Sequence, residues 1–447
     1  MVKSLPCELP PTNQWLNLVE GGVLCLAFPL LLFPTAYYPA TLAVLLLLVM
    51  GWLARWMIGR ETFAVSPFNG ALLIWQIAVG TGILVTALPE LTLPKATGLI
   101  LGLAVWRYMG LAIRSPRALS WALGLLLLVG AGLIMLGILS TNWPAKVPLL
   151  TGLLRYVPPQ LINLPDSPSS GVHANQLAGI VVFFWAMNFS FLLGTAPQRE
   201  HKVRYGGLLM VFGGLTGILL LSQSRSGWIG ALGSAWIALA GWSGFLPHSH
   251  WRTVLRVLLV SSLCLGLVGV LWAGPERLQR LWDEPSGMAA LGGLNTMTFR
   301  FEVWRWALAA TQDFLFTGCG LGTFRQVVRL LYPLNVPPGY DIAHAHNIFL
   351  QVAVDVGVPG LIAYLALLGL AGMTGGQIAR RAPRYRPLAL SLLSGLIALH
   401  IYGLTDALAP GSKPAVIFWG ALGLLAALDS LVAAEKQEQE QEQELAI

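Results

Sequence analysis

Charged residues are scarce in this chain. Only 11% of its 447 residues are Asp, Glu, Lys or Arg, whereas soluble domains carry about 25%. Hydrophobic residues make up 56%, and the mean hydropathy is +0.69. This composition excludes an ordinary soluble protein of several domains and predicts an all-α polytopic membrane protein. The net charge is +7, but basic residues in such a chain first report membrane topology, so we expect no nucleic-acid partner.

Cysteine is scarce too. Cys7, Cys25, Cys264 and Cys319 form no CxxC pair and no other metal-ligand spacing. A disulfide framework and a cysteine-based metal cluster are therefore not indicated. No small-residue cleavage site follows the first apolar region, so we expect this segment to be retained as a membrane helix.

Long apolar runs, by contrast, are frequent. A helix needs about 20 apolar residues to cross a bilayer core of about 30 Å, and we predict about twelve such spans. They are residues 19–35, 39–57, 70–88, 94–113, 120–140, 174–195, 205–222, 227–245, 255–273, 358–375, 387–406 and 413–433.

The basic residues predict the orientation of these spans. Cytoplasmic connections are the ones rich in Lys and Arg, and alternate short connections here have that composition. Both termini are therefore expected in the cytoplasm. The basic residues concerned are Arg55 and Arg60; Arg107, Arg114 and Arg117; Arg199, Lys202 and Arg204; Arg252 and Arg256; and Arg380, Arg381, Arg384 and Arg386.

We accordingly predict one integral membrane domain, residues 1–447. It contains a large outer loop, residues 274–357, and ends in an acidic, low-complexity cytoplasmic tail, residues 434–447. The loop contains several arginines, which the topology rule permits because long loops cross the membrane largely regardless of charge. Salt bridges within the loop and an anionic ligand are both open explanations for them.

Two arginines outside the cytoplasmic connections are candidates for binding an anion. Arg225 lies in a polar turn between two spans, with no acidic residue nearby. A guanidinium group suits phosphate oxygens, although snorkelling to lipid headgroups is an alternative. Arg300 lies on a predicted amphipathic helix, residues 298–308, and has no acidic residue three or four positions away. Arg305 on the same helix has Glu302 at that spacing, so we favour Arg300 for ligand binding.

The segment from His344 to Gly360 ends the longest polar interval of the chain. We predict a short helix that begins near Ala343 and breaks at Gly357 and Pro359. His346 on this helix is either a packed histidine or a general base, since imidazole titrates near neutral pH. His344 would point about 200° away from it on a helix, and no Cys, Asp or Glu cluster nearby completes a ligand set, so we expect no metal.

A glycine-rich stretch, Thr317 to Phe324, lies between these two candidates. It lacks the strand and the third glycine of a dinucleotide-binding fingerprint. We interpret it as a turn whose backbone passes close to a neighbouring segment, with a phosphate cradle as the less favoured alternative.

Three of these elements, in this order, resemble the O-antigen ligase and polymerase family of bacterial envelope glycosyltransferases. They are Ser222 to Trp228, Arg300 to Phe324 and His346 to Leu361, and the stretch from Gly171 to Ala178 is also similar to a family pattern. The resemblance covers about residues 170–375, while the first five spans match only in character.

The resemblance implies a GT-C-like membrane glycosyltransferase of the bacterial inner membrane that requires no metal and no cofactor. Its donor would be a glycan linked to undecaprenyl pyrophosphate, and its acceptor a lipid or glycan hydroxyl. Carried over by motif, Arg225 and Arg300 would bind the pyrophosphate and His346 would deprotonate the acceptor. Asn347 and Asn175 would be supporting residues. His344 is not part of the family pattern, and a supporting role and an incidental position are both open for it.

Other functions remain open at this point. A ligase that transfers glycan to lipid A core is favoured over a polymerase that extends the lipid-linked glycan. Cyanobacterial relatives have also been labelled bicarbonate transporters. A transporter needs ionisable residues along a path within the membrane, whereas the spans contain only Gln76, Asn188, His400 and a few hydroxyls, with Asp406 at a helix end. A membrane scaffold without catalysis would leave the two arginines and His346 unexplained.

Overall fold

The computed structural model describes residues 11–141, 172–195, 202–283, 297–333 and 342–445, with a few isolated positions between 143 and 161. Within these residues the chain is helical and forms no strand beyond one isolated bridge between Thr141 and Val172. Cys7, Gly171 and Arg199 lie outside the described residues, as do positions 284–296 and 334–341 of the predicted loop. The helices are α1 (Pro11–Leu32), α2 (Tyr38–Met57), α3 (Asn69–Leu84), α4 (Pro89–Ala112), α5 (Pro116–Ser140), α8 (Ala174–Gly194), α9 (Lys202–Leu221), α10 (Arg225–Ser243), α11 (His250–Asp283), α12 (Met297–Asp313), α13 (Phe324–Leu331), α14 (Ile348–Arg381), α15 (Arg386–Tyr402), η5 (Lys413–Ala415) and α16 (Val416–Leu445).

The predicted class, a helical polytopic membrane protein, is confirmed. Each of the twelve predicted spans falls on a helix, and eight helices of the described residues are long and apolar enough to cross a membrane. These eight are α1, α2, α5, α8, α9, α11, α14 and α16. The other four predicted spans fall on α3, α4, α10 and α15, so the number twelve stays a prediction.

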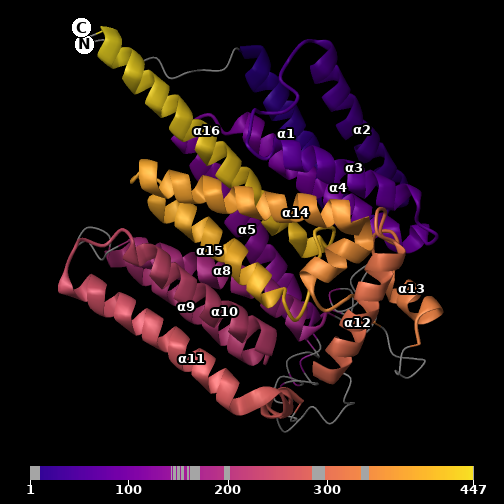
Figure 1. Ribbon diagram of the computed structural model, residues 1–447. Helices are drawn as coiled ribbons and strands as arrows, with labels where there is room; N and C mark the ends of the chain where they lie inside the picture. Colours follow the sequence, from indigo (N-terminus) through magenta and orange to yellow (C-terminus); the bar gives the residue numbers. More distant parts are fainter. Residues whose placement is uncertain are drawn as a thin grey trace.

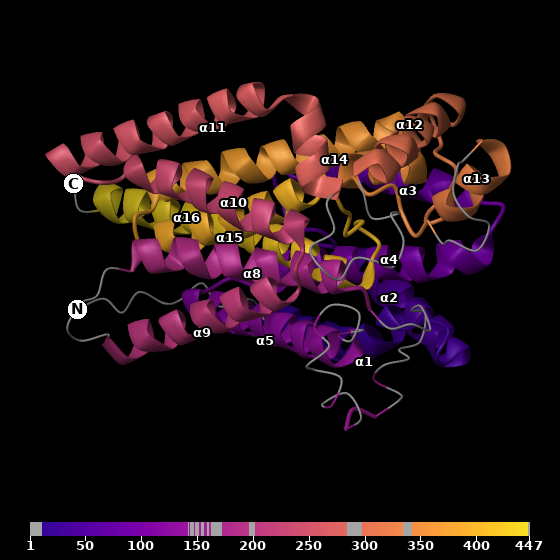
Figure 2. The ribbon, with the colours of Figure 1, turned by 90° about the horizontal axis from the view of Figure 1, so that it is seen from below.

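The bundle is built around two buried helices, α8 and α16. In the apolar, membrane-length stretches of α8 and α16, 67% and 83% of the residues are buried. The corresponding share is 6% in α9 and in α11. Figure 2 shows α9 and α11 on opposite sides of the bundle, with α8, α10, α15 and α16 between them. Helices α12 and α13 lie at the end of the bundle where α14 begins (Figure 1).

Both ends of the predicted outer loop coincide with glycine kinks inside helices. Gly274 interrupts α11 with a φ of 67°, and Gly357 interrupts α14 with a φ of 74°. A proline follows each glycine within two residues, at Pro275 and Pro359. Proline removes a helical hydrogen bond, and only glycine adopts positive φ without steric cost. The predicted break at Gly357 and Pro359 is therefore confirmed.

The assignment of Arg55 and Arg107 to connections between spans was wrong. Both lie inside helices and are buried, at 5% and 2% exposure, and both pair with Glu20 of α1. The Nε atom of Arg55 is 2.8 Å from Glu20, and the Arg107 guanidinium lies 5.0 Å from the centre of the Trp52 ring. Local sequence patterns do not indicate this cluster, because its members are far apart in the chain. The claim that the spans contain no charged side chains is thereby corrected, and Lys95 within α4 corrects it further.

Candidate active site

Helix α14 begins later than predicted. Asn347 is its N-cap, and the Asn347 side-chain oxygen accepts hydrogen bonds from the backbone N–H groups of Phe349 and Leu350, at 2.9 and 3.1 Å. Asn is a preferred capping residue because it satisfies these otherwise unpaired donors. The helical start near Ala343 was therefore wrong, and His344 and His346 lie in the loop before the helix. Their rings lie side by side, with centroids 4.4 Å apart, instead of pointing about 200° apart.

His346 has a left-handed backbone, with a φ of 49°. Among the described residues only one other non-glycine residue, Gln223, has a positive φ. Such a conformation costs about 1–3 kcal/mol and persists where the surroundings impose it. Here the His346 N–H donates to His344 Nδ1 at 3.1 Å, and the His346 carbonyl accepts from Trp304 Nε1 at 3.2 Å. The loop thus holds the imidazole in one position.

A buried polar network on the first turns of α14 bonds to this loop and holds it in place. The side-chain oxygen of Gln351 accepts from the Ala345 N–H at 2.7 Å, and its Nε2 donates to Asp355 at 2.9 Å. Asp355 also accepts from the N–H of Gly322 at 2.9 Å. The predicted close approach of the glycine-rich turn is confirmed, because a side chain on Gly318 would collide with the Asp355 backbone. The network thereby ties the histidine loop to the turn.

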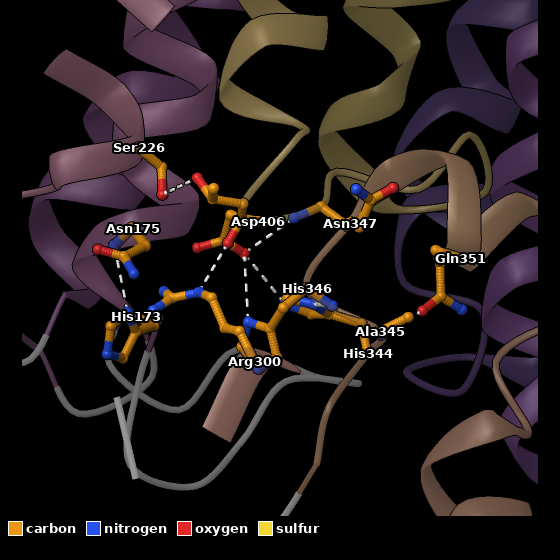
Figure 3. Close-up of polar contacts among 12 residues, drawn as sticks. His173, Asn175, Ser226, Arg300, His344, Ala345, His346, Asn347, Gln351 and Asp406 are labelled. Carbon is orange, nitrogen blue, oxygen red and sulfur yellow. Dashed lines mark hydrogen bonds and ion pairs between the residues drawn. The ribbon is translucent and has the colours of Figure 1, made fainter. Parts of the chain in front are cut away.

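Asp406 completes the site, and sequence reasoning missed its role. It lies in the segment after α15, is 2% exposed and accepts from the Ala407 N–H at 2.9 Å. Its Oδ1 atom lies 3.3 Å from His344 Nε2 and 4.0 Å from His346 Nδ1. Figure 3 shows the carboxylate between the two histidines and Arg300. Asp406 was interpreted as a helix-end residue, although α15 ends four residues earlier at Tyr402.

Arg300 reaches the same segment from α12. It is 5% exposed, and its Nε donates to the Thr405 carbonyl at 2.8 Å. Arg305, by contrast, is exposed, and its guanidinium lies 5.1 Å from the centre of the Trp306 ring. The sequence analysis favoured Arg300 over Arg305 for ligand binding. In the structure Arg300 lies in the site and Arg305 lies outside it.

Arg225 is linked to the site through its neighbour. It is the first residue of α10, whose N-cap is Ser224. The hydroxyl of Ser226 lies 2.8 Å from the hydroxyl of Thr405, the residue whose carbonyl accepts from Arg300. The start of α10 therefore borders the buried cluster.

The two predicted supporting asparagines join their helices to the end of α15. Asn347 Nδ2 donates to the Leu404 carbonyl at 3.0 Å. The Asn175 carbonyl accepts from the Tyr402 hydroxyl at 2.9 Å, and the Asn175 N–H donates to His173 Nδ1 at 3.2 Å. Both act mainly by fixing backbone, which places the Asp406 segment against α8 and α14.

The charges of the cluster favour neutral histidines beside an ionised carboxylate. Burial lowers the pKa of His344, and burial and the neighbouring His344 hold the pKa of His346 well below its ordinary value. Burial opposes ionisation of Asp406, but the nearby positive charges, those of protonated His344 and His346 and of Arg300, outweigh it and lower the pKa of Asp406. When the imidazoles are neutral, Arg300 is the one charged group of these three that still favours the ionised carboxylate, since a guanidinium group stays charged at all relevant pH values.

The same three side chains have the composition of a metal site. One donor atom each from His344, His346 and Asp406 lies within 4.8 Å of the others. Tetrahedral zinc with bonds of 2.0–2.1 Å separates its ligands by about 3.4 Å; the His344–Asp406 pair has this spacing at 3.3 Å, and the His346–Asp406 pair is wider at 4.0 Å. Both sequence arguments against a metal, the missing acid and the diverging imidazoles, are therefore wrong, and the absence of a metal stays a prediction.

These features together define a helical membrane protein in which a buried arginine and a buried carboxylate meet two half-buried histidines where several helices end. Residues 208–365 match the family described as O-antigen ligase, which confirms the resemblance. The matched range contains Arg225, Arg300 and His346 but neither Asn175 nor Asp406. No curated protein matches the chain. The match covers about a third of the chain and contains the predicted outer loop together with the helices on either side of it.

Proposed function

We propose that this protein is an O-antigen ligase-like, GT-C-type glycosyltransferase of the bacterial inner membrane. It would move a glycan from undecaprenyl pyrophosphate to a hydroxyl of lipid A core, or of a similar acceptor, at the periplasmic face, with both termini in the cytoplasm. One observation carries the proposal. Arg300, His346 and Asp406 are distant in sequence, and they meet at one buried position beside the start of α10.

In the proposed reaction His346 acts as the general base. Its Nδ1 faces Asp406 at 4.0 Å, which leaves Nε2 for the acceptor hydroxyl. The acceptor oxygen loses its proton to Nε2 and bonds to the anomeric carbon, while the bond from that carbon to the pyrophosphate oxygen breaks. The imidazolium formed beside Asp406 is stabilised by the carboxylate, because opposite charges attract strongly where water is excluded.

The leaving pyrophosphate gains negative charge as its bond to the sugar breaks. Arg300 and Arg225 would bind it, and two guanidinium groups stabilise this growing charge more than they stabilise the bound donor. A base and two cations account for the proton and for the leaving group. The proposed reaction therefore needs no metal and no cofactor.

Transfer in reconstituted membranes tests the proposal. Vesicles with the full chain receive an undecaprenyl-pyrophosphate oligosaccharide and a lipid A core acceptor, and labelled product is quantified for wild type, His346→Gln and Arg300→Lys. We expect His346→Gln to lose transfer but retain donor binding. Arg300→Lys keeps a charge but loses the planar guanidinium group and its hydrogen bond to Thr405. This variant should therefore lose both transfer and donor binding.

The products decide between related functions. Glycan that grows on the carrier lipid instead of on the acceptor would identify a polymerase. Wild-type rates in His346→Gln would refute the assignment of the base. Bicarbonate flux in the same vesicles, without transfer to any acceptor, would replace the enzyme with a transporter.

A further inference from the structure

A second polar feature lies at the opposite end of the bundle. Helix α10 begins beside the candidate active site at Arg225 and ends at Ser243, and α11 starts at His250 (Figure 1). The last residues of the connection between them and the first turns of α11 line a cavity of about 520 Å³. Its lining is His248, Ser249, His250, Arg252, Thr253, Arg256 and Val257, with two arginines, two histidines, two hydroxyls and no acidic side chain.

The two arginines of this cavity contact the end of α10 and the connection that follows it. Arg252 Nη1 donates to the Leu246 carbonyl at 3.3 Å and lies 3.4 Å from His248 Nδ1. Arg256 Nε donates to the hydroxyl of Ser243 at 3.4 Å. Guanidinium groups fixed in this way lose less side-chain entropy when they bind an anion than freely moving ones do.

The cavity also borders a face suited to lipid. Only 6% of the residues in the apolar, membrane-length stretch of α11 are buried, and Val257, which lines the cavity, is 57% exposed. Trp251 beside it is 76% exposed, and tryptophan is enriched at the level of lipid headgroups. An anion in the cavity would thus lie where the exposed apolar surface of α11 begins.

We propose that this cavity binds the phosphodiester headgroup of an anionic phospholipid, whose acyl chains lie along α11. Arginine forks match phosphate oxygens bidentately, and the hydroxyls of Ser249 and Thr253 supply further donors. Free inorganic phosphate would meet the same groups but would gain nothing from the apolar wall. The site is separate from the proposed glycosyl transfer and does not depend on it.

The test measures lipid retention by the full chain in detergent, by native mass spectrometry, with phosphatidylglycerol, phosphatidylcholine and inorganic phosphate. The probe variant is Arg252→Ala/Arg256→Ala. The control, Arg114→Ala/Arg117→Ala, removes two arginines from another connection on the predicted cytoplasmic side. Melting temperatures are recorded for all three proteins to show that each is folded.

We expect wild type and control to retain phosphatidylglycerol at least tenfold more strongly than phosphatidylcholine. The probe variant should lose about tenfold in affinity or more, since each basic side chain near a membrane surface contributes measurably to anionic lipid binding. Equal losses in probe and control variants would mean general surface attraction and would overturn the site. Full displacement of the lipid by equimolar inorganic phosphate would overturn the lipid assignment.

Discussion

Asp406→Asn is the substitution that most directly tests the proposed site. The change keeps the size of the side chain. It also keeps an oxygen that can accept the hydrogen bond that the Ala407 N–H donates to Asp406 in the wild type, at 2.9 Å. It removes the negative charge that lies 4.0 Å from His346 Nδ1. If His346 is the base, the variant should fold and bind donor but transfer glycan slowly.

The expected loss follows from the geometry. Two opposite charges 4 Å apart interact by about 4 kcal/mol at an effective dielectric constant of 20, and each 1.36 kcal/mol is tenfold in rate. The upper limit is therefore about 10³ in kcat. Since the asparagine dipole recovers part of this interaction, we expect a fall of about 10² with little change in the KM of the donor.

The pH profile separates this role from a structural one. The charge of Asp406 raises the pKa of His346 against the larger lowering effect of burial. Without the carboxylate the imidazolium is less favoured, so His346 should lose its proton at lower pH. The acid limb of the kcat profile should then move to lower pH, which a merely loosened structure would not cause.

Transfer assays on wild type, Asp406→Asn and Asp429→Asn over a pH series provide the measurement. Asp429 is a partly buried carboxylate near the middle of α16, close to Arg381. It controls for the general cost of removing a carboxylate. Wild-type kcat in Asp406→Asn, or an unchanged acid limb, would refute the reasoning.

Three further outcomes are expected. The acid limb of wild-type kcat should lie below pH 6.5, because burial lowers the pKa of His346 and the base stays neutral into mildly acidic solution; a limb above pH 6.5 would contradict this. EDTA should leave transfer unchanged, whereas micromolar Zn²⁺ should inhibit it by occupying His344, His346 and Asp406, as a zinc titration of wild type and His344→Ala would show. Gly357→Ala should lower the melting temperature, since φ is 74° and the new Cβ would lie 2.7 Å from the Phe316 carbonyl carbon; an unchanged melting temperature would exclude this strain.

Hydropathy and local charge predicted much of the fold. Each apolar run of about 20 residues became a helix, because a segment in lipid must satisfy its backbone hydrogen bonds internally. The glycine and proline pair at Gly357 and Pro359 correctly marked a break. Counting charges along the predicted amphipathic helix separated Arg300 from Arg305, since only Arg305 has an acidic residue one turn away. These inferences use information within a few residues of each position.

What the sequence could not provide was information across long separations. Asp406 is 60 positions after His346, and nothing near it in the chain indicates that it faces an imidazole. Glu20 likewise gave no sign of its two arginine partners on α2 and α4. The helical start near Ala343 failed for a different reason. Asn347 is a better N-cap than helix-interior residue, and the hydrogen bond that the Ala345 N–H donates to the Gln351 side chain holds the preceding residues in a loop.

Strained backbone occurs in both the arginine part and the histidine part of the site. In the described residues, positive φ outside glycine occurs at Gln223, two residues before Arg225, and at His346 itself. Glycine would adopt either conformation without the cost of about 1–3 kcal/mol. At Gln223 the strained turn is fixed by buried serines, with Ser224 accepting from the Gly227 N–H at 3.2 Å. Apolar packing of a helix bundle does not require strained backbone. We therefore infer that the Gln223 turn and the His346 loop are both held in one fixed geometry because the site requires it.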